Sequence, residues 1–319
     1  MTAYPRPMQE RPQQIADAEV AALLRSEWRL DLTGLSYLPV GFGGYHWLGT
    51  DTAARRWFVT VQEQSRADPD GLAAALETAA GLAAAGLDFV VPPLRSPSGR
   101  LLALLGCRHA VSVFAYHEAE PGHWGDTLSS ADRAALVGML GCLHRATPTP
   151  ATPVRGLQLA CRHVLDFSLR ERDVPWCGGP FAEPARVALA GHADTLASAL
   201  DRFDALVAEV SGDGRPLVMT HGEPHPGNLL RCGSRLLLVD WDTVGLAPPE
   251  RDLWWLAGED GCDAAGSIGV SQAALELYRL RWALDDIGLF LAEFRAPHQR
   301  TADTEVSFAG LQSELQHLG

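Results

Sequence analysis

The stretch from residue 218 to residue 243, VMTHGEPHPGNLLRCGSRLLLVDWDT, restricts the possible folds more than any other part of the chain. Pro224, Pro226 and Gly227 exclude a helix through its polar half, because proline lacks an amide hydrogen and clashes with the preceding helical turn. The short apolar runs on either side predict strands, two of them joined by a turn at residues 233–234. The histidines, acids and asparagine of this stretch therefore lie in loops between strands, which fits either a chemical site or an ordinary polar loop.

The first third of the chain is patterned as a small, mainly β region. Residues 35–63 hold two apolar segments joined by a turn-rich stretch, which predicts an antiparallel hairpin. Three glycines lie inside the first of these segments: Gly41, Gly43 and Gly44. Residues 67–89 start with acidic residues and predict one helix, and further short strands are predicted at residues 89–94 and 101–116.

The rest of the chain is patterned mostly for helices. Three stretches have apolar residues at helical spacing: 129–147, 183–210 and 271–296. The apolar face of the last one includes Leu275, Tyr278, Leu289 and Phe290. We expect an α+β fold, with a small N-terminal antiparallel β lobe containing one helix (residues 1–115) and a larger, mainly helical lobe (residues 116–319).

The composition limits the classes of protein to consider. The 319 residues are 47% hydrophobic and 20% charged, as in a globular protein. The formal net charge of -13 argues against nucleic acid as a partner and is compatible with a cationic small molecule. The chain has no lysine, which excludes every mechanism that needs one.

Cysteine spacing and hydropathy bear on the cellular location. The six cysteines form no C-x-x-C pair, so neither a zinc-ligand pattern nor a disulfide framework is predicted. Residues 1–14 are polar and proline-rich, without the apolar core of a signal peptide, and no apolar run is long enough to cross a bilayer. We therefore expect a cytoplasmic protein without a membrane partner.

Three kinds of chemistry use side chains like those of the central stretch. His221-Gly222-Glu223 has the H-x-E pattern of zinc deaminases, but the P-C-x-x-C that completes their metal site is missing. The H-E-x-x-H of zinc proteases needs a helix, which the prolines forbid. Phosphoryl transfer needs a carboxylate to orient the attacking hydroxyl, and oxygen ligands that hold Mg²⁺ against the nucleotide phosphates. Glu223, Asn228 and Asp240 supply these groups in the order found in kinases.

Three blocks of sequence resemble the aminoglycoside phosphotransferase family: HGEPHPGN at residues 221–228, LLLVDWDT at 236–243 and APPERDLW at 247–254. They are most similar to the viomycin/capreomycin and spectinomycin phosphotransferase-like antibiotic kinases. YLPVGFGGYHW, at residues 37–47, is similar to the nucleotide-covering hairpin of that family. The resemblance implies a two-lobed, protein-kinase-like fold. It also implies Mg²⁺-dependent transfer of the γ-phosphate of ATP or GTP to a hydroxyl of a small molecule, above all an antibiotic.

The resemblance also implies a role for each matching residue. Glu223 takes the place of the catalytic Asp, and Asn228 and Asp240 take the places of the two catalytic Mg²⁺ ligands. His225 is implied either to contact the substrate or to brace the loop. The implied nucleotide-binding residues are Gly41, Gly43 and Gly44 at the phosphates, Thr60 near the lysine position, and Phe114 and Tyr116 at the hinge beside the base. Structural roles are implied for His221 and Asp252.

The chain departs from the family pattern at two places. Glu223 is one methylene longer than the usual Asp, so its carboxylate must sit differently relative to the substrate hydroxyl. A kinase strand also carries a lysine that binds the phosphates and pairs with a helix glutamate. Here Thr60 lies near that place, Arg56 is a candidate to reach the phosphates, and Glu77 would lack its usual partner.

These departures keep two other functions open. A pseudokinase-like, nucleotide-binding regulator fits the missing lysine, although the presence of both metal-ligand positions favours an enzyme. A metabolic kinase of the same fold, acting on an amino alcohol or a sugar, is the other alternative. Five acids either line a cleft for a cationic substrate or are ordinary surface charges: Glu259, Asp260, Asp263, Asp285 and Asp286. For Asp242 we expect a capping role rather than a metal contact.

Overall fold

A computed structural model describes residues 9–41, 43–63, 69–123, 125–256 and 269–318. The chain forms two compact units. The sheet unit comprises Arg6–Arg155 and Val218–Ala247, and the helical unit comprises Gly156–Leu217 and Pro248–Gly319.

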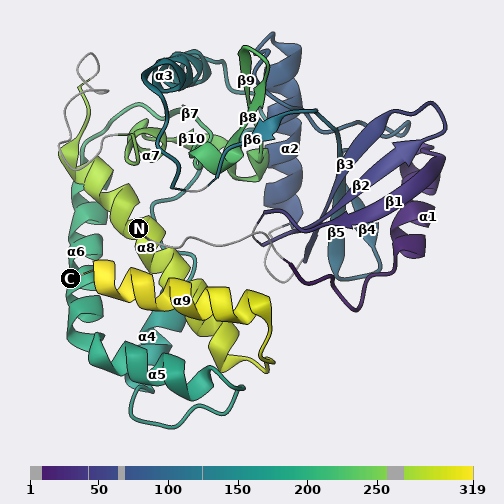
Figure 1. Cartoon of the computed structure of the whole chain (residues 1–319). Helices are drawn as coiled ribbons and strands as arrows, with labels where there is room; N and C mark the ends of the chain where they lie inside the picture. Colours follow the sequence, from purple (N-terminus) through teal and green to yellow (C-terminus); the bar gives the residue numbers. More distant parts are fainter. Residues whose placement is uncertain (1–8, 42, 64–68, 124, 257–268, 319) are drawn as a thin grey trace. The chain divides into compact units, whose positions relative to one another are not determined.

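A five-stranded antiparallel sheet is the base of the sheet unit (Figure 1). In spatial order its strands are β1 (Leu32–Leu38), β2 (Tyr45–Asp51), β3 (Arg56–Glu63), β5 (His109–Ala115) and β4 (Ala103–Leu105). Residues 35–63 thus form three strands rather than one hairpin. The reason is the glycine-containing turn between β1 and β2, which divides the first apolar segment. The expected turn follows β2, where the carboxylate of Asp51 accepts hydrogen bonds from the backbone N–H groups of Ala53 and Arg55. The glycines expected inside an apolar segment lie instead in the turn between β1 and β2.

Two helices, α1 (Asp17–Trp28) and α2 (Pro69–Ala84), cover opposite faces of this sheet (Figure 1). In β5, Val111 packs in the apolar cluster of α1, whereas its neighbour Ala110 packs in the cluster of α2. Neighbouring strand residues point to opposite faces, so the two helices must lie on different sides. Only α2 was predicted, and α1 is a second helix of this region.

The central stretch of the sequence adds two small sheets to the same unit. One pairs β7 (Val218–Thr220) with β10 (Gly245–Ala247), and the other pairs β6 (Glu120–Pro121), β8 (Leu229–Cys232) and β9 (Arg235–Leu238). The predicted strands of this stretch are therefore confirmed. Helix α3 (Ser130–His144) is confirmed as well, with the side chain of Ser129 capping its first turn. Residues 89–94, predicted as a strand, form only isolated bridges.

Helices alone build the described part of the helical unit. They are α4 (Arg162–Arg170), α5 (Ala182–Gly191), α6 (Ala193–Gly212), α7 (Glu250–Leu253), α8 (Gln272–Arg295) and α9 (Ala302–His317). The single helix predicted over residues 183–210 is interrupted at His192, whose backbone leaves helical geometry just after Gly191, a poor helix former. Helices α4 and α9 had not been predicted. On α8, Leu289 is 45% exposed, because it points about 100° away from its buried neighbour Phe290.

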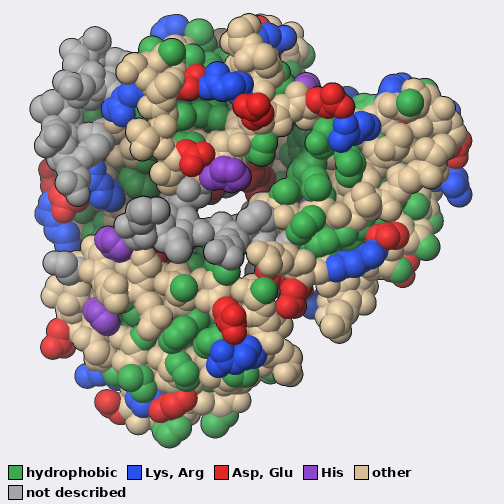
Figure 2. Space-filling view, in the orientation of Figure 1, with side chains coloured by type: hydrophobic (Ala, Val, Ile, Leu, Met, Phe, Trp, Pro, Cys, Tyr) green, Lys and Arg blue, Asp and Glu red, His purple; other side chains and the backbone are tan. Residues whose placement is uncertain are grey.

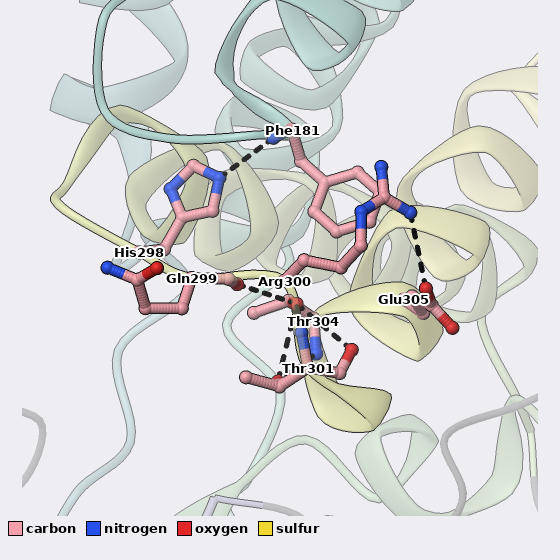
Figure 3. Close-up of polar contacts among 7 residues, drawn as sticks. All are labelled: Phe181, His298, Gln299, Arg300, Thr301, Thr304 and Glu305. Carbon is pink, nitrogen blue, oxygen red and sulfur yellow. Dashed lines mark hydrogen bonds and ion pairs between the residues drawn. The ribbon is translucent and has the colours of Figure 1, made fainter.

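The junction of α8 and α9 is held against the start of α5 (Figure 3). The backbone N–H of Phe181 donates to His298 Nε2 at 3.0 Å, and the guanidinium of Arg300 lies 4.6 Å from the centre of the Phe181 ring. Thr301 caps α9 by accepting a hydrogen bond from the N–H of Thr304. These contacts join the start of α5 to the α8–α9 junction, and buried residues of all three helices belong to one core cluster.

Arginine side chains are scattered among acidic ones on the surface drawn in Figure 2. Many of them form ion pairs within one unit, such as Arg202 with Glu276 and Arg25 with Asp31. Within the described residues, no helix is long and apolar enough to cross a membrane.

Candidate active site

The loop after β7, residues 221–228, is braced by a buried histidine. His221 is fully buried, its Nε2 lies 2.9 Å from the carbonyl oxygen of Val239, and its Nδ1 accepts the N–H of Glu223 at 3.2 Å. The ring therefore has its proton on Nε2 and links the start of this loop to the end of β9. This bracing contact agrees with the structural role implied for His221.

Asn228 is oriented by two acceptors. Its Nδ2 donates to the carbonyl oxygen of Glu223 at 2.9 Å and lies 3.3 Å from His225 Nε2. Burial lowers the pKa of His225 to about 3, with a further contribution from His221, so the ring is neutral and accepts this bond. Because both acceptors face the amide nitrogen, the amide oxygen of Asn228 points away from them, as a metal ligand requires. The observed contact of His225 is that of a loop brace.

The next strand brings Asp240 beside Asn228. The backbone N–H of Val239 donates to the carbonyl oxygen of Asn228 at 3.0 Å, and Asp240 follows directly. Asp240 has a left-handed backbone, with φ 65° and ψ 62°, which is uncommon for a residue with a side chain. Such strain is typical of functional positions, where the surrounding structure holds the residue in place.

The carboxylates of this region repel one another. The negative charge of Asp242 raises the pKa of Asp240 well above its usual range, followed by desolvation and the charge of Glu223. Asp240 is exposed to solvent, so we attribute the rise of its pKa mainly to the neighbouring charges. A divalent cation relieves this kind of repulsion.

The donor set fits Mg²⁺ better than a metal held by protein alone. In the described part of the chain, no three His, Cys, Asp or Glu side chains are grouped to hold a metal ion. Mg²⁺ usually takes one or two protein oxygen ligands and completes its shell with water and substrate phosphates. Asn228 and Asp240 match this demand.

The turn between β1 and β2 contains Gly41, Gly43 and Gly44, and Gly44 lies over the end of β3 that carries Thr60 and Gln62. Gly41 has φ 77°, and a Cβ there would lie 2.8 Å from His46 Nε2, so only glycine suits the position. Below the turn, Thr60 Oγ1 lies 3.2 Å from His46 Nδ1. Two residues further along the same strand face, Gln62 Nε2 donates to Asp242 Oδ2 at 3.0 Å. This bond joins β3 to the acidic cluster within the sheet unit.

The hinge residues lie at the end of β5. Phe114 pairs with Phe58 of β3, and the N–H of Tyr116 donates to the carbonyl oxygen of Arg56 at 3.0 Å. The guanidinium of Arg56 lies 4.0 Å from the centre of the Tyr116 ring and 2.6 Å from Glu118 Oε1. Arg56, which the sequence suggested as a phosphate ligand, is therefore bound to Glu118 and Tyr116 at the hinge end of β3.

Other predicted residues have different surroundings. Glu77 is paired with Arg95 through two hydrogen bonds, and so has a partner in place of the missing lysine. Asp252 is buried in α7 of the helical unit. Asp285 accepts hydrogen bonds from Arg281 and from the N–H of Ala160, so it serves local structure. Three further acids of the suggested cationic cleft lie outside the described residues: Glu259, Asp260 and Asp263.

Two contacts at the candidate site were missed in the sequence. Gln62 and Asp242 are 180 positions apart, so no local spacing relates them, although Gln62 shares a strand face with Thr60. The guanidinium of Arg155 donates to the carbonyl oxygens of Asp242 and Val244, at 3.1 Å and 2.9 Å, and holds the turn behind the acids. Asp242, for which a capping role was expected, accepts a hydrogen bond from Gln62.

A kinase-like fold with this loop defines a class of phosphate-transferring proteins, and sequence comparison identifies the family. The model of the phosphotransferase enzyme family (APH) matches residues 36–299, and the chain belongs to this family. The resemblance noted in the sequence is thereby confirmed. No curated protein matches the chain.

Solved structures confirm the fold class. A spectinomycin phosphotransferase in complex with ADP and spectinomycin has a TM-score of 0.76 at 16% identity, over 94% of this chain and 95% of that one. A microcompartment-associated aminopropanol kinase has a TM-score of 0.62 at 16% identity, over 94% and 95%. An amicoumacin kinase in complex with AMP-PNP, Ca²⁺ and Ami has a TM-score of 0.58 at 14% identity, over 95% and 94%. At these identities the likeness is one of fold.

Proposed function

We propose that this protein is a Mg²⁺-dependent O-phosphotransferase that moves the γ-phosphate of ATP or GTP to a hydroxyl of a small molecule, with an antibiotic as the acceptor. Residues 1–115 would cover the nucleotide, and residues 116–319 would provide the catalytic and substrate-binding lobe. We place its action in the cytoplasm, with neither nucleic acid nor membrane as a partner.

The observation that carries this proposal is the arrangement of Glu223, Asn228 and Asp240. One loop and the adjoining strand hold all three, with Asn228 bonded to the backbone of Glu223 and to that of Val239. Phosphoryl transfer requires one carboxylate that orients the acceptor hydroxyl. It also requires oxygen ligands for the metal, which here are an amide and a second carboxylate. An ordinary polar loop has no need for the bracing by His221 or for the strained backbone of Asp240.

Each residue has a distinct part in the reaction. Glu223 orients the acceptor hydroxyl and takes its proton as the oxygen–phosphorus bond forms and the bond to the β-phosphate oxygen breaks. Asn228 and Asp240 hold the metal, which neutralises phosphate charge when bound. Gly41, Gly43 and Gly44 bring backbone N–H groups near the phosphates, with Thr60 beneath them, while Phe114 and Tyr116 border the base. His225 keeps Asn228 in place, and of the two roles that the sequence left open, a substrate contact and a loop brace, we assign it the substrate contact as well.

Solved structures of the same fold support the proposed acceptor class. Two of the solved structures above are kinases crystallised with the antibiotics spectinomycin and amicoumacin. The net charge of -13 suits an acceptor with amino groups, which includes amino alcohols such as that of the aminopropanol kinase.

A nucleotide-binding regulator is the second candidate, because the chain has no lysine and Arg56 and Glu77 are engaged with other residues. A phosphotransfer screen read by mass spectrometry separates the two functions. The protein meets Mg²⁺ with ATP or GTP and a panel of tuberactinomycin peptides, aminocyclitols, nucleoside antibiotics and amino alcohols.

A product heavier by one phosphoryl group, and missing with Asp240→Ala, establishes the enzyme and its acceptor class. Nucleotide binding without any product across the panel favours the regulator. A protein that binds no nucleotide refutes both functions.

A further inference from the structure

Strand β3 carries Gln62 on the face that points away from helix α1. Successive side chains of a strand point to opposite faces, and the buried residues Val59 and Val61 pack in the apolar cluster of α1. Gln62 therefore points to the other face. Its amide Nε2 donates to Asp242 Oδ2 at 3.0 Å, which links the end of β3 to the short turn η2 (Trp241–Thr243).

The backbone of η2 is held from other directions. The guanidinium of Arg155 donates to the carbonyl oxygen of Asp242 at 3.1 Å, and Thr243 Oγ1 donates to the carbonyl oxygen of His221 at 2.8 Å. These bonds restrain the main chain but leave the carboxylate of Asp242 able to rotate, because the terminal torsion of an aspartate is broad. The bond from Gln62 restrains that rotation.

The side chain of Asp242 lies beside that of Asp240, the carboxylate proposed to bind the metal. The negative charge of Asp242 is the largest cause of the raised pKa of Asp240, and a side-chain hydrogen bond between the two contributes as well. Because like charges repel, an unrestrained Asp242 would turn away from Asp240. Holding one carboxylate in place therefore also restricts the directions that are open to the other.

The group that holds Asp242 is an amide, which has no charge of its own. An amide hydrogen bond stabilises a carboxylate without cancelling its charge, whereas an arginine at the same place would neutralise it. Asp242 thus keeps its negative charge next to Asp240, where it adds to the attraction for a divalent cation.

We propose that Gln62 is a positioning residue for the metal site: its hydrogen bond holds Asp242 beside Asp240, and Asp242 in turn directs the Asp240 carboxylate and strengthens its hold on Mg²⁺. The inference rests on the proposed function and adds a residue of β3 to it. It predicts that Gln62 has no influence on metal binding once the side chain of Asp242 is removed.

A double-mutant cycle tests this prediction with two single variants of the full-length protein and their combination. Gln62→Met keeps the length of the side chain without a donor, and Asp242→Ala removes the acceptor. Calorimetry measures the affinity of each variant for ADP in Mg²⁺ and again in EDTA.

We expect Gln62→Met to weaken binding of Mg-ADP by about tenfold, as the loss of a group that orients a metal ligand does. Its affinity for ADP in EDTA should stay within about twofold of the wild type, because the bond acts on the metal site and not on the nucleotide. The double variant should match Asp242→Ala within about twofold, since Gln62 then has no carboxylate to hold.

Glu63 provides the matched control on the same strand, because it points to the opposite face of the sheet and pairs with Arg108. Glu63→Gln should leave the affinity for Mg-ADP within about twofold of the wild type, since an exposed ion pair contributes little. Thermal melts show whether each variant is folded. If Gln62→Met does not fold, Gln62→Asn takes its place, because it stays polar but is one methylene too short for the bond.

Three results overturn the inference and leave the proposed function standing. The first is an unchanged affinity for Mg-ADP in the folded Gln62→Met variant. The second is an equal loss in Mg²⁺ and in EDTA, which would mark a general disruption of the site. The third is a double variant in which the two single losses multiply, because Gln62 would then act independently of Asp242. A wild type that binds no ADP even with Mg²⁺ refutes the proposed function, and the inference with it.

Discussion

Two sides of the site, both in the sheet unit, differ in the way they handle charge. The turn side, built from His46, Thr60 and Gln62, is neutral, whereas the loop side gathers the carboxylates of Glu223, Asp240 and Asp242. A single hydrogen bond of 3.0 Å, from Gln62 to Asp242, joins them. The turn side therefore offers hydrogen-bond groups, whereas the loop side gathers negative charge.

The two sides also differ in how they are held. On the loop side, Thr220 and Thr243 each donate a side-chain hydrogen bond to a backbone carbonyl at 2.8 Å, and Arg155 spans two carbonyls of the turn. These bonds fix the acids in place despite their repulsion. The turn side is fixed mainly by glycine geometry and by the pairing of β2 with β3. The predictions below test this contrast, from the largest expected effect to the smallest.

Asp240→Ala should have the largest effect. We expect turnover of the acceptor identified by the screen to fall by on the order of 10³-fold, because a metal ligand is lost. The melting temperature of the protein without nucleotide should stay equal or rise, since a repelled carboxylate is removed. Steady-state kinetics and a thermal melt measure both. Retention of full turnover would show that Asp240 is not a ligand.

Glu223→Gln should act on the chemical step alone. We expect kcat to fall by about 100-fold, because the amide cannot accept the proton of the hydroxyl. The affinity for Mg-ADP should change less than twofold, since Asn228 contacts only the backbone oxygen of Glu223. Full activity of this variant would refute the assigned role, and a parallel loss of nucleotide affinity would point to a general disruption of the loop.

Arg155→Ala should loosen the loop side without removing an acid. We expect a loss of about 2 kcal/mol in the free energy of unfolding, because carbonyls lose their donors. A roughly tenfold lower kcat should accompany it, since small displacements of catalytic groups are costly. Arg145, an exposed arginine of the same unit, provides the control variant Arg145→Ala. If stability falls but kcat does not, Arg155 has no positioning role.

His46→Gln tests the turn side through pH. The folded-state pKa of His46 is about 4 and its ordinary value is 6.5, so the unfolded chain binds the extra proton first. The wild type should therefore lose stability as pH falls from 6.5 towards 4, by up to about 3 kcal/mol from this group. Urea unfolding near pH 7 and near pH 4 should show a smaller loss in His46→Gln. An equal loss would show that the ring is not held neutral.

Local patterns in the sequence predicted much of this fold. Helices α3 and α8 and the strands of the central stretch follow from caps, apolar spacing and turn residues. The same rules failed at His192, where a poor helix former and a change of backbone direction divide a continuous apolar pattern. The same rules could have found α1, which was missed although its buried residues Val20, Leu24 and Trp28 are four positions apart and its first turn is acidic.

The order of Glu223, Asn228 and Asp240 was determined by the sequence alone. Two prolines, a glycine and a short hairpin lie between them, and such local restraints leave the chain few ways to arrange the three residues. The charge balance of the site was decided only by the tertiary structure. Gln62 is hydrogen-bonded to Asp242, 180 positions away, and Arg155 to the carbonyl oxygen of Val244, 89 positions away. Arg95 is paired with Glu77. These contacts depend on how sheets and helices pack, and no spacing along the chain encodes that packing.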